Sequence, residues 1–164
     1  MKLLFYLILV LLLVPLQTTL LPHVSVWNIK PDLGLVSAAL VGIFAGELEG
    51  LLVGLTIGWV LSLFSAGELW VSLLTNGGVG LLTGFLGRQV SQVTSISLGA
   101  GLLLMSLASG LLGAMSFKGL DLSQIWWMVE SIVIPQACFD GVMGAGFYWL
   151  LSRRFGPTRL RTEY

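Results

Sequence analysis

The residue with the clearest chemical potential is Asp140, because it stands inside a long apolar segment near the carboxyl end of the 164-residue chain. A charge near the centre of a membrane helix costs at least about 2.5 kcal/mol, so this side chain must face protein or water. Gln136 and Gly144 stand four residues before and after it and share its helix face. Asp140 could form a binding or coupling site, or a hydrogen bond between helices, for example to Asn76 or Ser109. We favour the hydrogen bond, because polar side chains commonly join membrane helices.

The other reactive residues do not combine into a catalytic or metal-binding set. Pro135 separates Glu130 from Asp140, so the two acids are not expected to share a helix face as the acids of an aspartyl protease must. His23 and Cys138 alone cannot supply the ligands of a zinc site, and His23 has no nucleophile as a partner. Phosphate-binding loops, dinucleotide fingerprints and HExxH motifs are absent from the sequence. We therefore predict a protein that is not an enzyme and needs no cofactor or metal.

The composition indicates a membrane protein. Hydrophobic residues make up 56% of the chain and charged residues only 10%, whereas an average soluble domain contains about 25% charged residues. Eight basic and eight acidic residues cancel, so the net charge gives no reason to expect a nucleic-acid partner. We predict one transmembrane domain over residues 1–152, followed by a basic cytoplasmic tail over residues 153–164.

Glycine recurs at every fourth position between residues 42 and 58, within a strongly apolar segment. Each interior glycine costs a water-exposed helix about 1 kcal/mol relative to alanine. In a bilayer the chain must stay helical, and glycines four residues apart let two helix backbones approach closely. The pattern predicts two close-packed membrane helices that meet at Glu47–Glu49. The candidates for helix packing and for binding partner helices are Gly42, Gly46, Gly50, Gly54, Gly58, Gly80 and Gly84.

Apolar segments predict an all-α bundle of about six transmembrane helices. The expected spans are residues 3–21, 33–46, 50–64, 69–87, 96–115 and a last span that ends at Ser152. The second span is short, because fourteen residues extend about 21 Å, against a hydrocarbon core of roughly 30 Å. Asp32 should act as its N-cap. In the fourth span, Asn76, Gly80 and Gly84 lie on one small and polar stripe that we expect to face the bundle.

The last part of the chain combines a tryptophan pair with a proline. Residues 122–134 predict a short amphipathic helix whose Trp126 and Trp127 suit the headgroup level of the membrane. Pro135 should kink or break the chain before the last span.

Six spans place both chain ends on the same side of the membrane. The basic residues expected on that side are Lys2, Arg88, Arg153, Arg154, Arg159 and Arg161, against Lys30 and Lys118 on the other side. The positive-inside rule then places both termini in the cytoplasm. The arginines of the tail would also attract anionic membrane lipids, at about 1 kcal/mol each, although we favour a role in setting topology.

Several of these motifs together resemble the MreD family of bacterial rod-shape-determining proteins. They are Pro31-Asp32 before the second span, the glycines at 46, 50 and 54, the turn at Ser65–Gly67, Gly80 with Gly84, Pro135-Gln136-Ala137, Asp140-Gly141-Val142 and the basic pair Arg153-Arg154. The resemblance covers most of the chain.

The resemblance implies a non-enzymatic, multi-pass scaffold subunit of the cell-elongation machinery in the bacterial inner membrane. Its implied partners are the bitopic protein MreC and, through it, the cytoskeletal MreB, the RodA glycosyltransferase and a class B penicillin-binding transpeptidase. The family's fold is thought to be similar to that of the substrate-binding S-components of energy-coupling-factor transporters. The alternative prediction is therefore a solute-binding subunit, whose pocket Asp140 and Asn76 would help to line.

Overall fold

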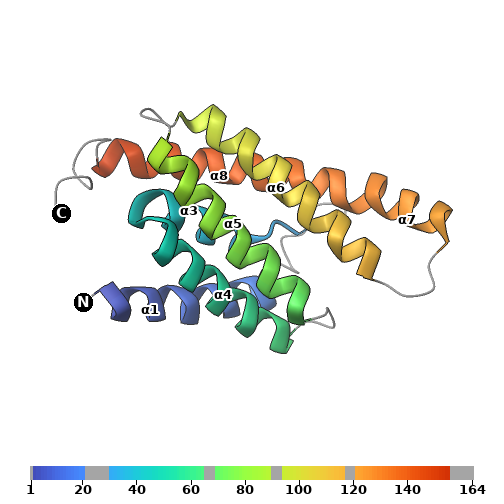
Figure 1. The fold of residues 1–164 in the computed structure, drawn as a ribbon, viewed down its shortest axis with the longest axis horizontal. Helices are drawn as coiled ribbons and strands as arrows, with labels where there is room; N and C mark the ends of the chain where they lie inside the picture. Colours follow the sequence, from blue (N-terminus) through green and yellow to red (C-terminus); the bar gives the residue numbers. More distant parts are fainter. Residues whose placement is uncertain (1, 21–29, 65–68, 90–93, 117–120, 156–164) are drawn as a thin grey trace.

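A computed structural model describes residues 2–20, 30–64, 69–89, 94–116 and 121–155, and these residues are almost entirely helical (Figure 1). The fold class predicted from the sequence, all-α, is confirmed. The elements in chain order are α1 (Lys2–Pro15), the π-helical turn η1 (Leu16–Leu20), α3 (Leu33–Ala45), α4 (Glu47–Phe64), α5 (Leu69–Gln89), α6 (Ser95–Ser116), α7 (Leu122–Met128), the π-helical turn η2 (Val129–Val133) and α8 (Ile134–Phe155).

Within the described ranges, three helices are long and apolar enough to cross a membrane, namely α4, α5 and α6. Their surfaces agree with this, since many large apolar side chains are exposed, including Leu52 on α4, Phe85 on α5 and Leu104 on α6. These exposed side chains would be unfavourable in water but suit contact with lipid. The chain is therefore a multi-pass membrane protein in its general architecture.

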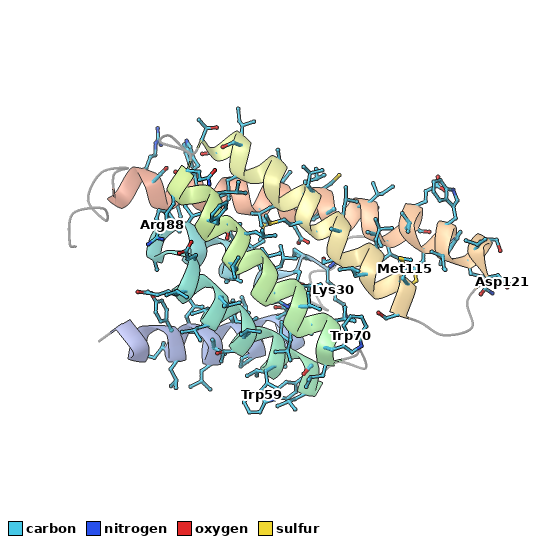
Figure 2. All side chains as sticks on the ribbon, viewed as in Figure 1. Lys30, Trp59, Trp70, Arg88, Met115 and Asp121 are labelled. Carbon is cyan, nitrogen blue, oxygen red and sulfur yellow. The ribbon has the colours of Figure 1, made fainter. Side chains whose placement is uncertain are left out.

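The helices run along a common long direction and place several ends together (Figure 1). The start of α1, the junction between α3 and α4, the end of α5, the start of α6 and the end of α8 all lie at the left end of the view. Arg88 marks this end in Figure 2, so we call it the Arg88 end. The end of α4, the start of α5, the end of α6 and the start of α7 lie toward the opposite end.

The bundle divides into two groups of helices. The first group, α3, α4 and α5, is packed closely along the lengths of its helices. The second, α6 with η2 and α8, is an equally intimate pair, whereas contacts between the two groups are sparse. A buried apolar cluster that includes Leu35, Val79, Leu102 and Tyr148 joins them. We refer below to the glycine group (α3, α4, α5) and the α6–α8 pair.

Helix α3 is short and begins inside the bundle. Its 13 residues extend about 20 Å at 1.5 Å per residue. Figure 2 shows Lys30, just before the helix, near the middle of the long direction, and α3 runs from there to the Arg88 end. The backbone amides at the start of α3 therefore lie inside the bundle, away from both of its ends. In that position they need hydrogen-bond acceptors from the protein itself.

The junction between α3 and α4 differs from the prediction. Gly46 makes the turn alone, with a φ of +113° that favours glycine, and its N–H donates to the carbonyl of Gly42 at 2.9 Å. Glu47 and Glu49 do not form a break between two helices, because both lie in the first turn of α4. Carboxylates stabilise this position by opposing the partial positive charge of a helix start.

Pro135 does not break the chain, which was one of the two outcomes predicted for it. Elements α7, η2 and α8 follow one another without interruption, and Pro135 lies in the first turn of α8. The N–H of Ile134 bonds the carbonyl of Val129, five residues back, as a π-helical turn requires. This wider turn directly precedes the proline, and π-turns of this kind accommodate residues that an ideal α-helix would exclude.

Candidate functional site

Asp140 is fully buried, at 0% exposure, and both of its carboxylate oxygens accept hydrogen bonds. The backbone N–H of Asp32 donates to Oδ1 at 2.7 Å, and the hydroxyl of Ser106 donates to Oδ2 at 2.6 Å. Asp140 belongs to α8, Ser106 to α6, and Asp32 is the N-cap residue of α3. One side chain thus connects the α6–α8 pair with the glycine group.

The amides at the start of α3 have acceptors within the chain. The side-chain Oδ1 of Asp32 accepts from the N–H of Leu35 at 3.1 Å, and the carbonyl of Asp32 accepts from the N–H of Val36 at 3.1 Å. Gln17, from η1, accepts from the N–H of Gly34 at 3.1 Å and donates its own amide to Asp32 Oδ1 at 3.0 Å. Val36 thus makes the first intrahelical bond, and, together with the Asp32–Asp140 bond, the other contacts satisfy three of the four amides that lack an intrahelical partner at the start of this helix, those of Asp32, Gly34 and Leu35.

We call Gln17, Asp32, Ser106 and Asp140 the polar junction. Its chemistry is that of a helix cap, since two carboxylates face the positive end of the α3 dipole and are held there by amide and hydroxyl donors. In the described part of the chain, no group of three or more histidine, cysteine, aspartate or glutamate side chains is placed to hold a metal ion. The junction therefore joins helices and completes the hydrogen bonding of a buried backbone.

The predicted partners of Asp140 were wrong, although the favoured role, a bond between helices, agrees with the geometry. Asn76 instead donates to the carbonyl of Ser72 in its own helix at 3.0 Å, and Ser109 donates to the carbonyl of Ser106 at 2.9 Å. Asn76 is buried, and its Oδ1 atom has no hydrogen-bond partner among the described residues. Gln136 lies one turn before Asp140 in α8 and is partly buried.

The predicted glycines lie where backbones of the glycine group touch. A Cβ atom on Gly50 would come within 2.5 Å of both the Cα of Gly42 and the carbonyl oxygen of Gly80. A Cβ on Gly58 would come within 2.5 Å of the carbonyl oxygen of Ser72, whose hydroxyl donates to the carbonyl of Gly58 at 2.9 Å. Any side chain at these positions would separate the helices.

The other predicted packing glycines also lie against the backbone of a neighbouring helix, with one exception. A Cβ on Gly42 would meet the backbone of Gly80, one on Gly54 would meet the carbonyl of Asn76, and Gly80 and Gly84 face the backbones of α4 and of the α3–α4 junction. Gly46 is the exception, because a Cβ there would meet nothing within 4 Å and its role is the turn.

These contacts decide which surfaces remain for partners. The glycine faces are filled by the chain's own helices, so a partner cannot reach the backbone at Gly50, Gly54 or Gly80 in this structure. A binding partner would have to contact the outward faces, which are rich in leucine, phenylalanine and tryptophan.

The basic residues predicted to set topology include two with described side chains. Arg88, at the end of α5, donates to Glu47 Oε1 at 2.7 Å and so links α5 to the start of α4. Arg153 places its guanidinium 4.3 Å from the ring centroid of Trp149, one turn earlier in α8. Arg154 lies in the last turn of α8. Arg159 and Arg161 lie outside the described residues, as do His23, Lys118 and the turn at Ser65–Gly67.

No family model, no curated protein and no solved structure matches this chain. The family resemblance therefore rests on the sequence motifs alone.

Proposed function

We propose that this protein is a non-enzymatic scaffold subunit of the bacterial cell-elongation machinery, located in the cytoplasmic membrane. Two lines of argument support the proposal. The sequence motifs resemble those of the MreD family, and the described polar side chains inside the bundle are largely engaged in holding its own helices together. A protein of this design presents shape and apolar surface to its surroundings rather than reactive groups.

We further propose that the chain crosses the membrane six times, with both termini in the cytoplasm. The α3 helix would cross together with the segment that precedes it, since 13 residues reach only about two thirds of a core of roughly 30 Å. The Arg88 end also receives the start of α1 and the end of α8, which carries Arg153. An end rich in arginine is expected to face the cytoplasm.

The observation that carries the scaffold proposal is that the side chains of the polar junction form their hydrogen bonds with the chain itself. Both oxygens of Asp140 accept hydrogen bonds from the chain, while Gln17 accepts one through Oε1 and donates one through Nε2. A site that binds a polar solute needs donors or acceptors that point into an open pocket. In the described residues, the amides of Asp32, Gly34 and Leu35 at the start of α3 already have acceptors within the chain, which favours a scaffold over the alternative, a solute-binding subunit.

The proposed partners are a bitopic protein of the MreC type and, through it, MreB, RodA and a class B penicillin-binding transpeptidase. Because the glycine faces are filled, we expect these contacts on outward helix surfaces.

The direct test is co-purification. The full chain, carrying an affinity tag, would be co-expressed with a single-pass membrane protein of the MreC type and isolated in mild detergent. We expect the single-pass protein to be retained in a fixed ratio after size-exclusion chromatography. Absence of the partner, together with thermal stabilisation of the purified chain by a vitamin from a panel, would favour the solute-binding alternative and overturn the proposal.

A further inference from the structure

Elements α7, η2 and α8 form one continuous helical rod that is longer than a bilayer is thick. The steps from Leu122 to Phe155 extend about 50 Å at 1.5 Å per residue. At the average tilt of about 20° the rod still spans about 47 Å, against a hydrocarbon core of roughly 30 Å. Part of the rod therefore lies outside the hydrocarbon.

The packing of α6 against the rod shows which part lies outside. Helix α6 is long and apolar enough to cross a membrane, and it runs antiparallel to α8 (Figure 1). A Cβ atom on Gly110 of α6 would meet the side chain of Val133, so these two residues are level with each other. Ser116, the last residue of α6, lies six positions past Gly110, and Trp127 lies six positions before Val133. Helix α6 therefore ends level with the junction of α7 and η2, and Figure 1 shows α7 continuing past that end.

The exposed surface of the rod changes character at the same level. Glu130 and Arg153 are both exposed, and the steps between them extend about 34 Å. Asp140 is the only charged residue between them, and it is fully buried. On the α7 side of Glu130, aromatic and polar side chains are exposed together. The exposed residues between Glu130 and Arg153 are Ile132, Ile134, Cys138, Phe139, Val142, Gly146, Phe147, Trp149 and Leu150.

Tryptophan marks both ends of this uncharged surface. Trp126 and Trp127 are 71% and 67% exposed at one end, and Trp149 is 49% exposed at the other. The two ends are about 33–35 Å apart along the helix, or about 31–33 Å at the average tilt, which matches the hydrocarbon core. Tryptophan is enriched at both membrane interfaces, because its ring is apolar and its N–H group is polar.

The direction of the side chains agrees with this placement. Side chains on a helix lean toward its N-terminus, so those of Trp126, Trp127 and Glu130 lean away from the middle of the rod. At the other end, the guanidinium of Arg153 leans back over the ring of Trp149, at 4.3 Å from its centroid. A glutamate that leans outward can keep its carboxylate among headgroups while its backbone lies at the edge of the hydrocarbon.

We propose that the rod crosses the membrane between Glu130 and Arg153, and that Trp126 and Trp127 bind the phospholipid headgroup layer at the end of the bundle opposite the Arg88 end. Their N–H groups would donate to phosphate and ester oxygens of the lipids. The crossing thus includes η2, and α7 extends through the headgroups. Asp140 lies near the middle of this crossing, so the tryptophan pair holds the polar junction at the centre of the membrane. This depth does not depend on the proposed function, because lipid contact sets it with or without a protein partner.

The depth of the rod can be measured directly by spin labelling. In the full chain with Cys138→Ser, a nitroxide label is attached in turn at Ser123→Cys, Ile132→Cys and Val142→Cys, which are exposed sites and leave both tryptophans in place. The proteins are reconstituted in phosphatidylcholine vesicles. Electron paramagnetic resonance then compares collisions of each label with oxygen, which concentrates in hydrocarbon, and with a water-soluble nickel complex.

We expect oxygen collisions to dominate at positions 132 and 142, with position 142 deeper by about 14 Å at the average tilt. Nickel collisions should dominate at position 123. Nickel access at position 132 equal to that at position 123 would overturn the inference, since η2 would then stand in water and the tryptophan pair would be left to a protein partner.

A double variant, Trp126→Leu with Trp127→Leu, tests the tryptophans themselves. Leucine keeps an apolar side chain but has no N–H group, so this end of the rod should move deeper and the ratio of oxygen to nickel collisions at position 132 should rise. Trp59→Leu, at an exposed tryptophan of α4, is the control and should leave the ratio unchanged. An unchanged ratio in the double variant would show that the pair does not set the depth, which contradicts its role as an anchor.

Discussion

The two halves of the bundle hold their helices together by different means. In the glycine group, backbone meets backbone, as where Gly50 faces Gly42 and Gly80. In the α6–α8 pair, side chains form more of the contact, since a Cβ on Gly110 would meet the side chain of Val133, and Ser106 bonds Asp140 across the interface. Backbone contacts cannot adjust, whereas side chains can change rotamer. The glycine group should therefore tolerate fewer substitutions, and the α6–α8 pair should depend on its buried hydrogen bonds.

The largest effect is expected from Gly80→Leu, because its Cβ would collide with the backbone of Gly50. Overpacking commonly costs about 1–3 kcal/mol and more where the neighbour cannot move. Gly78→Leu is the matched control on the same helix, since nothing lies within 4 Å of its Cβ position. Thermal unfolding in detergent should show a large loss for the first variant and little change for the second. Equal stability of the two would break the comparison.

The α6–α8 pair is tested by Asp140→Ala, which leaves the amide of Asp32 and the hydroxyl of Ser106 without their acceptor. Each unsatisfied buried group costs about 1–3 kcal/mol. Asp140→Asn should cost less, because its amide oxygen can still accept one of the two bonds. Val142→Ala, at an exposed site in the same helix, serves as the control. Unfolding that is unchanged in Asp140→Ala would show that the carboxylate does not hold the halves together.

A smaller effect is expected from Gln17→Leu, which removes the acceptor of the Gly34 amide and a donor to Asp32. Loss of a capping side chain costs about 1 kcal/mol. The change should speed hydrogen exchange at the start of α3 and leave the middle of α5 unaffected. Uniformly faster exchange in both helices would point to a general loss of packing instead.

The smallest effect is expected at the surface of the Arg88 end. Arg88→Gln removes the ion pair with Glu47. The side chain of Arg88 is two-thirds exposed. Such pairs contribute about 0–1 kcal/mol, and salt weakens them further. Stability should fall slightly in low salt and match the wild type in high salt, whereas Gln89→Ala, at the exposed neighbouring position, should show no salt-dependent difference.

The glycine group was the part of the fold that the sequence predicted best. A period of four identifies a helix face without knowledge of any partner, and close backbone contact accounts for four of the five glycines between residues 42 and 58, while the fifth, Gly46, makes the turn. The short helix α3 was also predicted with nearly its observed bounds, because its length follows from the separation of Asp32 and Gly46 in the sequence.

The polar junction was predicted only in part. Asp140 stood out as an acid in an apolar helix, but its acceptor role toward Asp32 joins residues 108 positions apart, which local patterns do not reveal. Gln17 could have been recognised as a buried hydrogen-bonding residue, since it is a polar amide within the first apolar segment. The sequence allowed either a kink or a break at Pro135; the chain does not break there, and the local pattern did not reveal the π-helical turn that directly precedes the proline.

The central claim is that Asp140, Asp32 and Gln17 cap the start of α3 inside the bundle without any ligand. Hydrogen exchange with mass spectrometry on the purified, ligand-free protein measures this directly at residues 32–36. We predict strong protection in the wild type and its loss in Asp140→Ala. Rapid exchange of these amides in the ligand-free wild type, slowed only by an added solute, would contradict the account.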